Sequence, residues 1–437
     1  MSSKKIYDSD FMYRSLRHIV DFFFRRSYKK LLRVGKDRIP QDQAIIYAPN
    51  HCNALMDALA ILDMDRRHKV FVARADIFQN PLLAKFLTFL KIMPIHRVRD
   101  GFRSVLAGEE TIEKSIEVLN NQVPFCILPE GTHRAMHSLL PLGKGLSRIA
   151  CRADKAITDG RHVCIVPVGL EYGDYIRMRS TLLVTVGTPI DVTDLIAAHP
   201  EMSEAELYVD IRRKTAEALK DLIVYIPDDD DYEATWELAK LSSGKVGEFR
   251  LQERFDANRS AVKGLEKLRR QQPETARQLF EKALAWKQAR QQARVSLHAV
   301  YTDKPLGAAL WRTLKMLLAL PLALPWAVVS APIWGIGEWL AFKDDDEAFR
   351  NSLRCGVTIV LWPLLLLVAA VVLFCTVKWY WALAALVLLV PAPYMTYEWF
   401  EQMRRLASAW RYCGKASLQR QKDALMKVLD DSLKTIK

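Results

Sequence analysis

The sequence has no C-x-x-C pair: its seven cysteines lie singly at positions 52, 126, 151, 164, 355, 375 and 413. Structural zinc sites use closely spaced cysteine pairs, so this pattern argues against such a site and indicates a reducing compartment. The first residues contain no short apolar run followed by a small-residue cleavage site, so we expect no signal peptide. The sequence also lacks a fixed-period repeat and a recognised nucleic-acid-binding motif.

The chain is long, hydrophobic and basic. Its 437 residues exceed the usual length of a domain with a single hydrophobic core, so two or three folded units are expected. Hydrophobic residues make up 50% of it, and 63 Lys and Arg against 50 Asp and Glu leave a formal charge of +13. Such an excess suits nucleic acid, a membrane surface or acidic small molecules. Because no nucleic-acid motif is present, we expect a membrane and acidic substrates rather than nucleic acid as partners.

Composition predicts five regions. The first is basic, and its helical repeat of apolar residues predicts a helix that either packs on the next domain or lies on anionic lipid. The regions are a basic amphipathic N-terminal helix region (1–40), an α/β domain (41–202), a charged helical region (203–305), a membrane region (306–400) and a basic helical tail (401–437).

The second region alternates short apolar segments with helical ones. The expected strands are AIIYAP, KVFVAR, FCILP, VCIVPVGLEY and LLVTVG, and the expected helices cover residues 103–121 and 144–154. This alternation predicts the α/β class, with a mainly parallel or mixed sheet covered by helices. Pro167 lies inside one of these strands, which predicts an edge strand or a bulge there.

Three uncharged runs near the C-terminus predict an integral membrane protein. They cover residues 316–337, 355–377 and 379–397, with 22, 23 and 19 residues, close to the roughly 20 that cross a bilayer. The first run contains three prolines, so we expect residues 316–341 to form a bent, re-entrant or interface-lying element that does not cross. The other two should form a hairpin that turns near Lys378.

A histidine and an aspartate stand inside an otherwise apolar stretch, APNHCNALMDALAI. His51 follows a predicted strand and Asp57 lies in the following predicted helix, so both should lie at the lip of the sheet, a common place for active sites. Burial of such groups is costly unless they pair or react. Asp57 could orient His51, which would then act as a general base toward an alcohol.

Three further segments carry polar residues next to predicted strands or helices. CILPEGTHR presents Glu130, Gly131 and Thr132 in a turn, and IMPIHRVR places Arg97, a side chain suited to phosphate, at a strand end. LLPLGKGLSRIA contains Lys144.

Taken in order, these motifs resemble the glycerolipid acyltransferase family. That family has Asn-His and Asp separated by a short spacer, then an Arg block, then Phe-Pro-Glu-Gly-Thr, then a Pro-containing strand, and the resemblance covers roughly residues 30–195. Two features depart from the usual pattern: five residues rather than four separate His51 from Asp57, and His133 stands where an Arg is usual. The H-x-N-x-x-x-D spacing and the large C-terminal membrane region look more like the membrane glycerol-3-phosphate/dihydroxyacetone-phosphate acyltransferases.

The resemblance implies direct acyl transfer without a metal or redox cofactor. His51 would deprotonate an acceptor hydroxyl, with Asp57 orienting it, and the alkoxide would attack the thioester of acyl-CoA or acyl carrier protein. The acceptor would be glycerol-3-phosphate or dihydroxyacetone phosphate, and the catalytic domain would face the cytoplasm. The substrate-binding residues so implied are Asn53, Arg97, Glu130, Gly131, Thr132 and Lys144.

Two other functions remain open from the sequence. A 1-acylglycerol-3-phosphate acyltransferase would use the same chemistry on a lysolipid acceptor. An inert membrane-anchored scaffold would bind a protein partner, but it would have no reason to keep His51, Asp57, Glu130 and Gly131 together. Cys52 beside His51 invites a covalent mechanism, yet no base clearly faces it.

Overall fold

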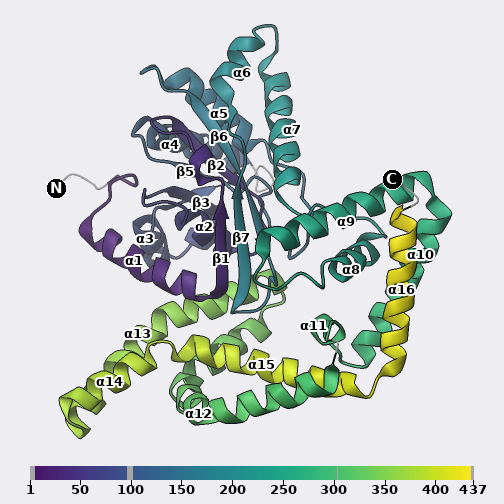
Figure 1. Ribbon diagram of the computed structural model, residues 1–437. Coiled ribbons are helices and arrows are strands. Elements are labelled where there is room, and N and C mark those ends of the chain that lie inside the picture. The colour runs from purple at the N-terminus through teal and green to yellow at the C-terminus, as the bar shows by residue number, and fades with distance from the viewer. Residues whose placement is uncertain (1–4, 96–101, 303, 435–437) are drawn as a thin grey trace. The chain divides into compact units, whose positions relative to one another are not determined.

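The computed structural model describes residues 5–95, 102–302 and 304–434, with only the backbone of residues 102–107 (Figure 1). The chain forms two compact units. The first contains Met1–Ile223 together with Asp346–Ser352, and the second contains Val224–Asp345 together with Leu353–Lys437. Each unit is described separately below.

A mixed sheet forms the centre of the first unit. Within the described residues its strands are β1 (Tyr28–Val34), β2 (Ala44–Pro49), β3 (Val70–Arg74), β4 (Ile92–Ile95), β5 (Phe125–Cys126), β6 (Val163–Tyr172), β7 (Ser180–Val186) and β8 (Ile190–Asp191). The order is β1-β7-β6-β2-β5-β3-β4, and β8 also pairs with β6. β6 pairs antiparallel with β7 and β8, whereas the other neighbours run parallel. The expected fold class, a mainly parallel or mixed sheet covered by helices, is confirmed.

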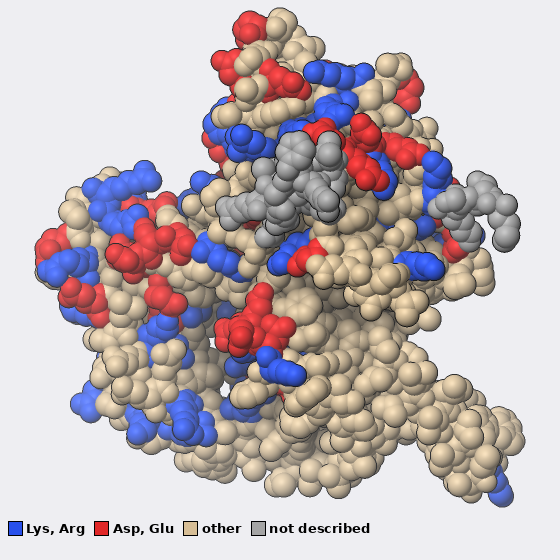
Figure 2. Space-filling view, turned by 180° about the vertical axis from the view of Figure 1, so that it is seen from behind, with Lys and Arg blue, Asp and Glu red and all other residues tan. Residues whose placement is uncertain are grey.

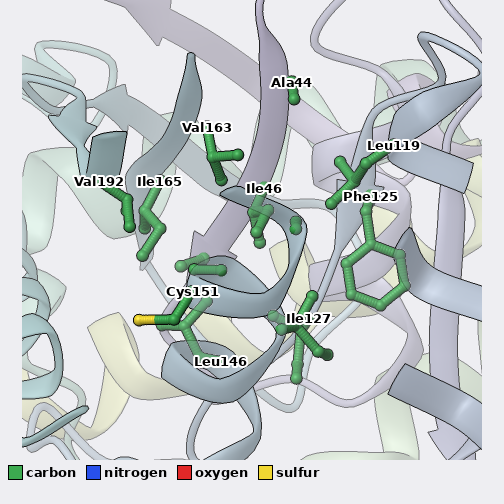
Figure 3. Close-up of a cluster of buried hydrophobic side chains, with 14 of the residues drawn as sticks. Ala44, Ile46, Leu119, Phe125, Ile127, Leu146, Cys151, Val163, Ile165 and Val192 are labelled. Atoms are coloured by element: carbon green, nitrogen blue, oxygen red, sulfur yellow. The ribbon is translucent and has the colours of Figure 1, made fainter. Parts of the chain in front are cut away.

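Helices cover the sheet and close its core. They are α1 (Phe11–Arg26), α2 (Leu55–Leu62), α3 (Pro81–Phe89), α4 (Phe102–Asn120), α5 (Gly145–Ala156), α6 (Val192–Ala198) and α7 (Glu204–Leu222). All six residues of β2 are buried, which is why this central strand reads as a continuous apolar run rather than an alternating one. Ile46, Phe125 and Leu146 bring β2, β5 and α5 into one buried cluster (Figure 3).

Two strands were missed by the sequence prediction. β1 falls in the region predicted as an N-terminal helix, and it pairs in parallel with β7 at the end of the strand order. Its sequence, YKKLLRV, is mostly only half-buried, so it carries a weak apolar signal. β8 has only two residues. Pro167 is not on an edge strand: it pairs with Ala48 in the centre of the sheet, between the part of β6 that pairs with β8 and the part that pairs with β7.

The N-terminal helix α1 packs on the first unit by one face. Tyr13, Phe23 and Phe24 are buried, and the Arg17 guanidinium donates to carbonyl oxygens that include that of Leu62 at the C-terminal end of α2. A cation is favourable at this end of a helix. Four other apolar residues of α1 stay exposed: Phe11, Met12, Ile19 and Phe22.

The second unit is helical throughout the residues described. Its charged part contains α8 (Tyr232–Ser242), α9 (Leu251–Gln271), α10 (Pro273–Gln292), α11 (Leu297–Val300) and α16 (Ala416–Lys434). These helices share a core in which Leu238, Leu268, Leu279 and Leu429 are completely buried. Their charged side chains form ion pairs along the exposed faces, such as Arg277 with Glu274 and Glu281.

The apolar part of the second unit contains α12 (Pro305–Lys343), most of α13 (Arg350–Thr376), α14 (Trp379–Leu389) and α15 (Ala392–Cys413). Among the described residues, two helical stretches are long and apolar enough to cross a membrane, Pro305–Lys343 and Glu347–Thr376. The pair α14 and α15, bent by 48°, would make a third if it counts as one span. The surface of α13 and α14 is almost wholly uncharged (Figure 2, lower right).

Residues 316–341, which we expected to be bent, re-entrant or interface-lying, belong to a helix without a break. α12 is one continuous helix that contains three prolines, and it is held against α15 by a hydrogen bond between Ser330 and Thr396 of 2.8 Å. Each proline removes one backbone hydrogen bond, a loss that neighbouring helices can offset. The break lies instead between α14 and α15, where Pro391 follows the end of α14. The turn expected near Lys378 is confirmed, because α13 ends at Thr376 and α14 begins at Trp379.

Candidate active site

The site lies where β2 leads into α2. Asn50, directly after β2, extends the pairing with β6: its amide nitrogen donates to Leu170 O at 3.2 Å and its amide oxygen accepts from Leu170 N at 2.7 Å. This side chain therefore fixes the point at which the chain leaves the sheet. His51 follows, and α2 begins four residues later at Leu55.

Asp57 is completely buried and accepts hydrogen bonds from five groups, one of which is the Cys52 thiol at 3.9 Å from Oδ1. Its Oδ2 accepts from the backbone N–H of Cys52 at 2.8 Å and of Asn53 at 2.7 Å, and it lies 2.8 Å from His51 Nδ1. Its Oδ1 accepts from the hydroxyl of Tyr172 on β6 at 2.7 Å. Asp57 occupies the third position of α2, where a carboxylate can reach back to the backbone that precedes the helix. The buried negative charge is thus held by donors from the turn, the histidine and the sheet.

His51 is oriented for general-base chemistry. A carboxylate can only accept, so the contact with Asp57 places the imidazole proton on Nδ1 and leaves the lone pair on Nε2. The side chain keeps 13% exposure, and Nε2 makes no hydrogen bond within the described part of the chain. An acceptor hydroxyl could therefore reach Nε2 while Asp57 stabilises the imidazolium that forms.

Glu130 ties the backbone of His51 to the neighbouring loop. Its Oε1 accepts from His51 N at 2.6 Å and its Oε2 accepts from Leu140 N at 2.8 Å. Burial raises the pKa of Glu130 to about 7, although these two hydrogen bonds and His51 oppose the rise. Both oxygens are occupied by backbone donors, so the contact predicted between Glu130 and an acceptor hydroxyl stays a prediction.

The other residues that the sequence singled out fall into three groups. Gly131 has a φ of 67°, a left-handed conformation that suits glycine, and both it and Thr132 are exposed in the turn. Lys144 is exposed at the start of α5. Asn53 is completely buried, and its amide group makes no hydrogen bond among the described residues. Arg97 lies outside the described residues.

Residues 31–171 match the family model Acyltransferase. This segment, called the acyltransferase domain below, contains both His51 and Asp57 as well as the turn with Glu130. No curated protein sequence matches the chain significantly. Among solved structures, it resembles the crystal structure of the 1-acyl-sn-glycerophosphate (LPA) acyltransferase PlsC from Thermotoga maritima, with 20% identity and a TM-score of 0.35 over 48% of this chain and 79% of that one. At so low a TM-score the likeness supports no conclusion about fold or substrate, whereas the family match supports acyl transfer as the chemistry of the domain.

Cys52 of the acyltransferase domain is unsuited to nucleophilic attack. Its side chain is buried, and burial raises the pKa of the thiol well above its usual range, with the nearby carboxylates of Asp57, Glu130 and Glu171 adding to the rise. A thiolate is the reactive form of cysteine, so this environment keeps Cys52 protonated. The geometry therefore does not support a covalent acyl intermediate on Cys52.

Three residues near the acyltransferase site were assigned no role in the sequence analysis, although Asn50 is the Asn of its Asn-His motif. Tyr172 holds Asp57, and Asn50 holds the end of β2, as described above. His137 is buried beside the site, where its Nδ1 lies 3.0 Å from Glu171 Oε1 and 3.1 Å from the hydroxyl of Tyr175. Glu171 and Tyr172 are the last two residues of the strand VCIVPVGLEY. The change there from apolar to polar residues is the sequence signal that could have identified them.

Proposed function

We propose that this protein transfers a fatty acyl group from a thioester donor, acyl-CoA or acyl carrier protein, to a hydroxyl of glycerol-3-phosphate or dihydroxyacetone phosphate in phospholipid biosynthesis. The observation that carries the proposal is the 2.8 Å contact between His51 Nδ1 and the buried, fully bonded Asp57. The family match over residues 31–171 supports the same chemistry.

The proposed step needs only the substrates and His51. Nε2 of His51 takes the proton from the acceptor hydroxyl as its oxygen attacks the thioester carbonyl. The carbon–sulfur bond then breaks and the ester is formed. The leaving thiolate takes from His51 the proton that came from the acceptor hydroxyl. General-base help of this kind contributes about 10²–10⁴-fold, and positioning of the two substrates adds more.

The acceptor phosphate needs cationic partners, and two are proposed. Lys144 is exposed at the start of α5, and Arg97 follows β4 in the sequence. The apolar helices of the second unit support an integral membrane protein. Since acyl-CoA and acyl carrier protein are cytoplasmic, the acyltransferase domain is proposed to face the cytoplasm.

The test is an acyl-transfer assay on the purified full-length protein in detergent. Labelled acyl-CoA is offered in parallel with glycerol-3-phosphate, dihydroxyacetone phosphate and lysophosphatidate, and the lipid products are separated. Product from either of the first two acceptors at the highest kcat/KM supports the proposal. Product from lysophosphatidate alone would show that lysophosphatidate is the acceptor instead. No transfer to any of the three acceptors, from either acyl-CoA or acyl carrier protein, would refute the proposed acyltransferase activity.

A further inference from the structure

The turn between His51 and Asp57 holds a backbone conformation that its sequence does not favour. Ala54 has φ 44° and ψ −120°, close to the first central residue of a type II′ turn, a position that normally takes glycine. A residue with a Cβ keeps such a conformation only when its surroundings enforce it. Ala54 lies between His51 and Asp57, so whatever holds the turn also affects the position of both side chains.

Ser352 supplies contacts on both sides of Ala54. Its Oγ accepts from Leu55 N at 3.1 Å, and its hydroxyl donates to Asn53 O at 3.4 Å. Ala54 precedes the first residue of α2 and has no side-chain oxygen to cap that helix. Ser352, which is 2% exposed, therefore provides the cap from a distant part of the sequence.

The segment that carries Ser352 also contacts the second motif of the site. This segment, Asp346–Ser352, is called the connector, because it follows α12 and includes the start of α13. Oδ2 of Asp346 lies 2.7 Å from His133 Nε2, while Oδ1 accepts from the connector's own Ala348 N. The His133 ring lies edge-on to the His51 ring, with 5.0 Å between their centroids.

Two buried amides lie beside these contacts. Asn53 and Asn351 are both completely buried, and neither amide group makes a hydrogen bond among the described residues. Unsatisfied buried amides are uncommon in regions that serve packing alone. One of them, Asn53, belongs to the turn, and the other, Asn351, precedes Ser352 in the chain.

We infer that the connector is a positioning element of the active site, with Ser352 holding the turn between His51 and Asp57 and Asp346 holding His133 beside His51. The change in kcat expected from this inference rests on the proposed function. It extends the site beyond the matched residues 31–171 to a segment between two long apolar helices. The connector touches no reacting atom: it acts through the turn and through His133.

The first test removes the Ser352 hydroxyl in the full-length protein. Ser352→Ala should lower kcat about fivefold to tenfold, the effect of one lost helix cap, and leave the KM of donor and acceptor unchanged. Adding Ala54→Gly should restore kcat, because glycine adopts this turn without help. Ser115→Ala is the matched control, since Ser115 is equally buried and bonds Thr111 O within α4. Unchanged kcat in Ser352→Ala, or no rescue by Ala54→Gly, would overturn the inference.

Asp346→Ala should likewise lower kcat at unchanged KM, whereas Asp345→Ala, which alters its exposed neighbour, should not. Hydrogen exchange separates a failure of this inference from a failure of the proposed function. The amide of Leu55 should exchange faster in Ser352→Ala than in wild type or Ser115→Ala, whatever reaction the protein catalyses. Equal exchange of Leu55 in all three proteins would show that Ser352 does not hold the turn.

Discussion

Replacement of Asp57 by asparagine isolates the charge that His51 depends on. The amide keeps the size of the carboxylate, and its oxygen can still accept from His51 and from the N–H groups of Cys52 and Asn53. Its NH₂ group would then face Tyr172, whose hydroxyl can turn to accept. Most of the hydrogen-bonding geometry can therefore persist in Asp57→Asn, while the negative charge beside the imidazole is lost.

The size of the effect follows from the 2.8 Å contact between His51 Nδ1 and Asp57 Oδ2. With the two charges centred about 4 Å apart and an effective dielectric constant of about 20, the carboxylate stabilises an imidazolium by about 4 kcal/mol. A neutral hydrogen bond retains roughly 1 kcal/mol of this. A net loss of about 3 kcal/mol in the transition state corresponds to a fall in kcat of about 10²-fold, since each 1.36 kcal/mol is tenfold.

The assay is steady-state acyl transfer by purified Asp57→Asn, with folding checked by thermal unfolding. Donor and acceptor KM should change little, because the lost interaction belongs to the imidazolium rather than to bound substrate. Asp63→Asn is the matched control: its carboxylate is equally buried in the residue after α2 but pairs with Arg25 and Arg33. That variant should lose stability and keep its kcat. A kcat of folded Asp57→Asn within about threefold of wild type would refute the role given to this charge, because such a factor is below 1 kcal/mol.

Three further results are expected. Because burial raises the pKa of Glu130 to about 7, its carboxylate becomes protonated below that pH and binds the His51 N–H less well. Protonation of Glu130 should therefore add to the fall in kcat that protonation of the base His51 causes at low pH, and Glu130→Gln should lose this added fall; a Glu130→Gln profile with the same shape as wild type would contradict the role of the carboxylate. Arg97→Ala should raise the KM of the phosphorylated acceptor and leave that of the donor, and a shift of the donor KM alone would show that Arg97 does not hold the phosphate. In sealed vesicles of a variant without native cysteines, Asp345→Cys should react with impermeant reagent from the same side as Asp159→Cys, and Lys378→Cys from the opposite side; labelling of the first two from opposite sides would show that α12 crosses.

The labelling result is expected from chain connectivity. Among the described residues no candidate span precedes α12, and we expect its start to lie on the same side of the membrane as the acyltransferase domain. The connector that follows α12 contacts Asn53 and His133 of that domain, so we expect the end of α12 on this side as well. A helix with both ends on one side does not cross. The apolar run after Cys355 and the run after Lys378 would then form the crossing hairpin, with aromatic residues at its far end.

The central strands could be predicted from the sequence because they are buried on both faces and read as uninterrupted apolar runs. β2 and β6 have the predicted bounds, and β3 and β7 begin or end within two residues of them. β1 could not be found in this way, because an end strand with Lys and Arg lacks that signal. The continuity of α12 was also missed, since proline content shows which hydrogen bonds are lost but not which neighbouring helix offsets them.

The pairing of His51 with Asp57 was expected from their motif, whereas the partners of Glu130 were not. A sequence shows that a carboxylate lies in a turn, but the backbone donors that reach it depend on how that turn packs. The Ser352 contact was still harder to predict, because Ser352 is 297 residues from Leu55 along the chain. The sequence shows only that residue 54 is an alanine. That its backbone adopts a conformation typical of glycine is known only from the structure.

The most direct test of acyl transfer through His51 compares two histidine replacements in one assay. His162 forms a 2.8 Å contact with Asp191 away from the site, so His162→Gln removes a similar pair without touching the motif. With labelled acyl-CoA and glycerol-3-phosphate, His162→Gln should keep wild-type kcat, and His51→Gln should lose at least about 10²-fold, the smallest contribution expected of a general base. Near wild-type turnover by folded His51→Gln would contradict the mechanism.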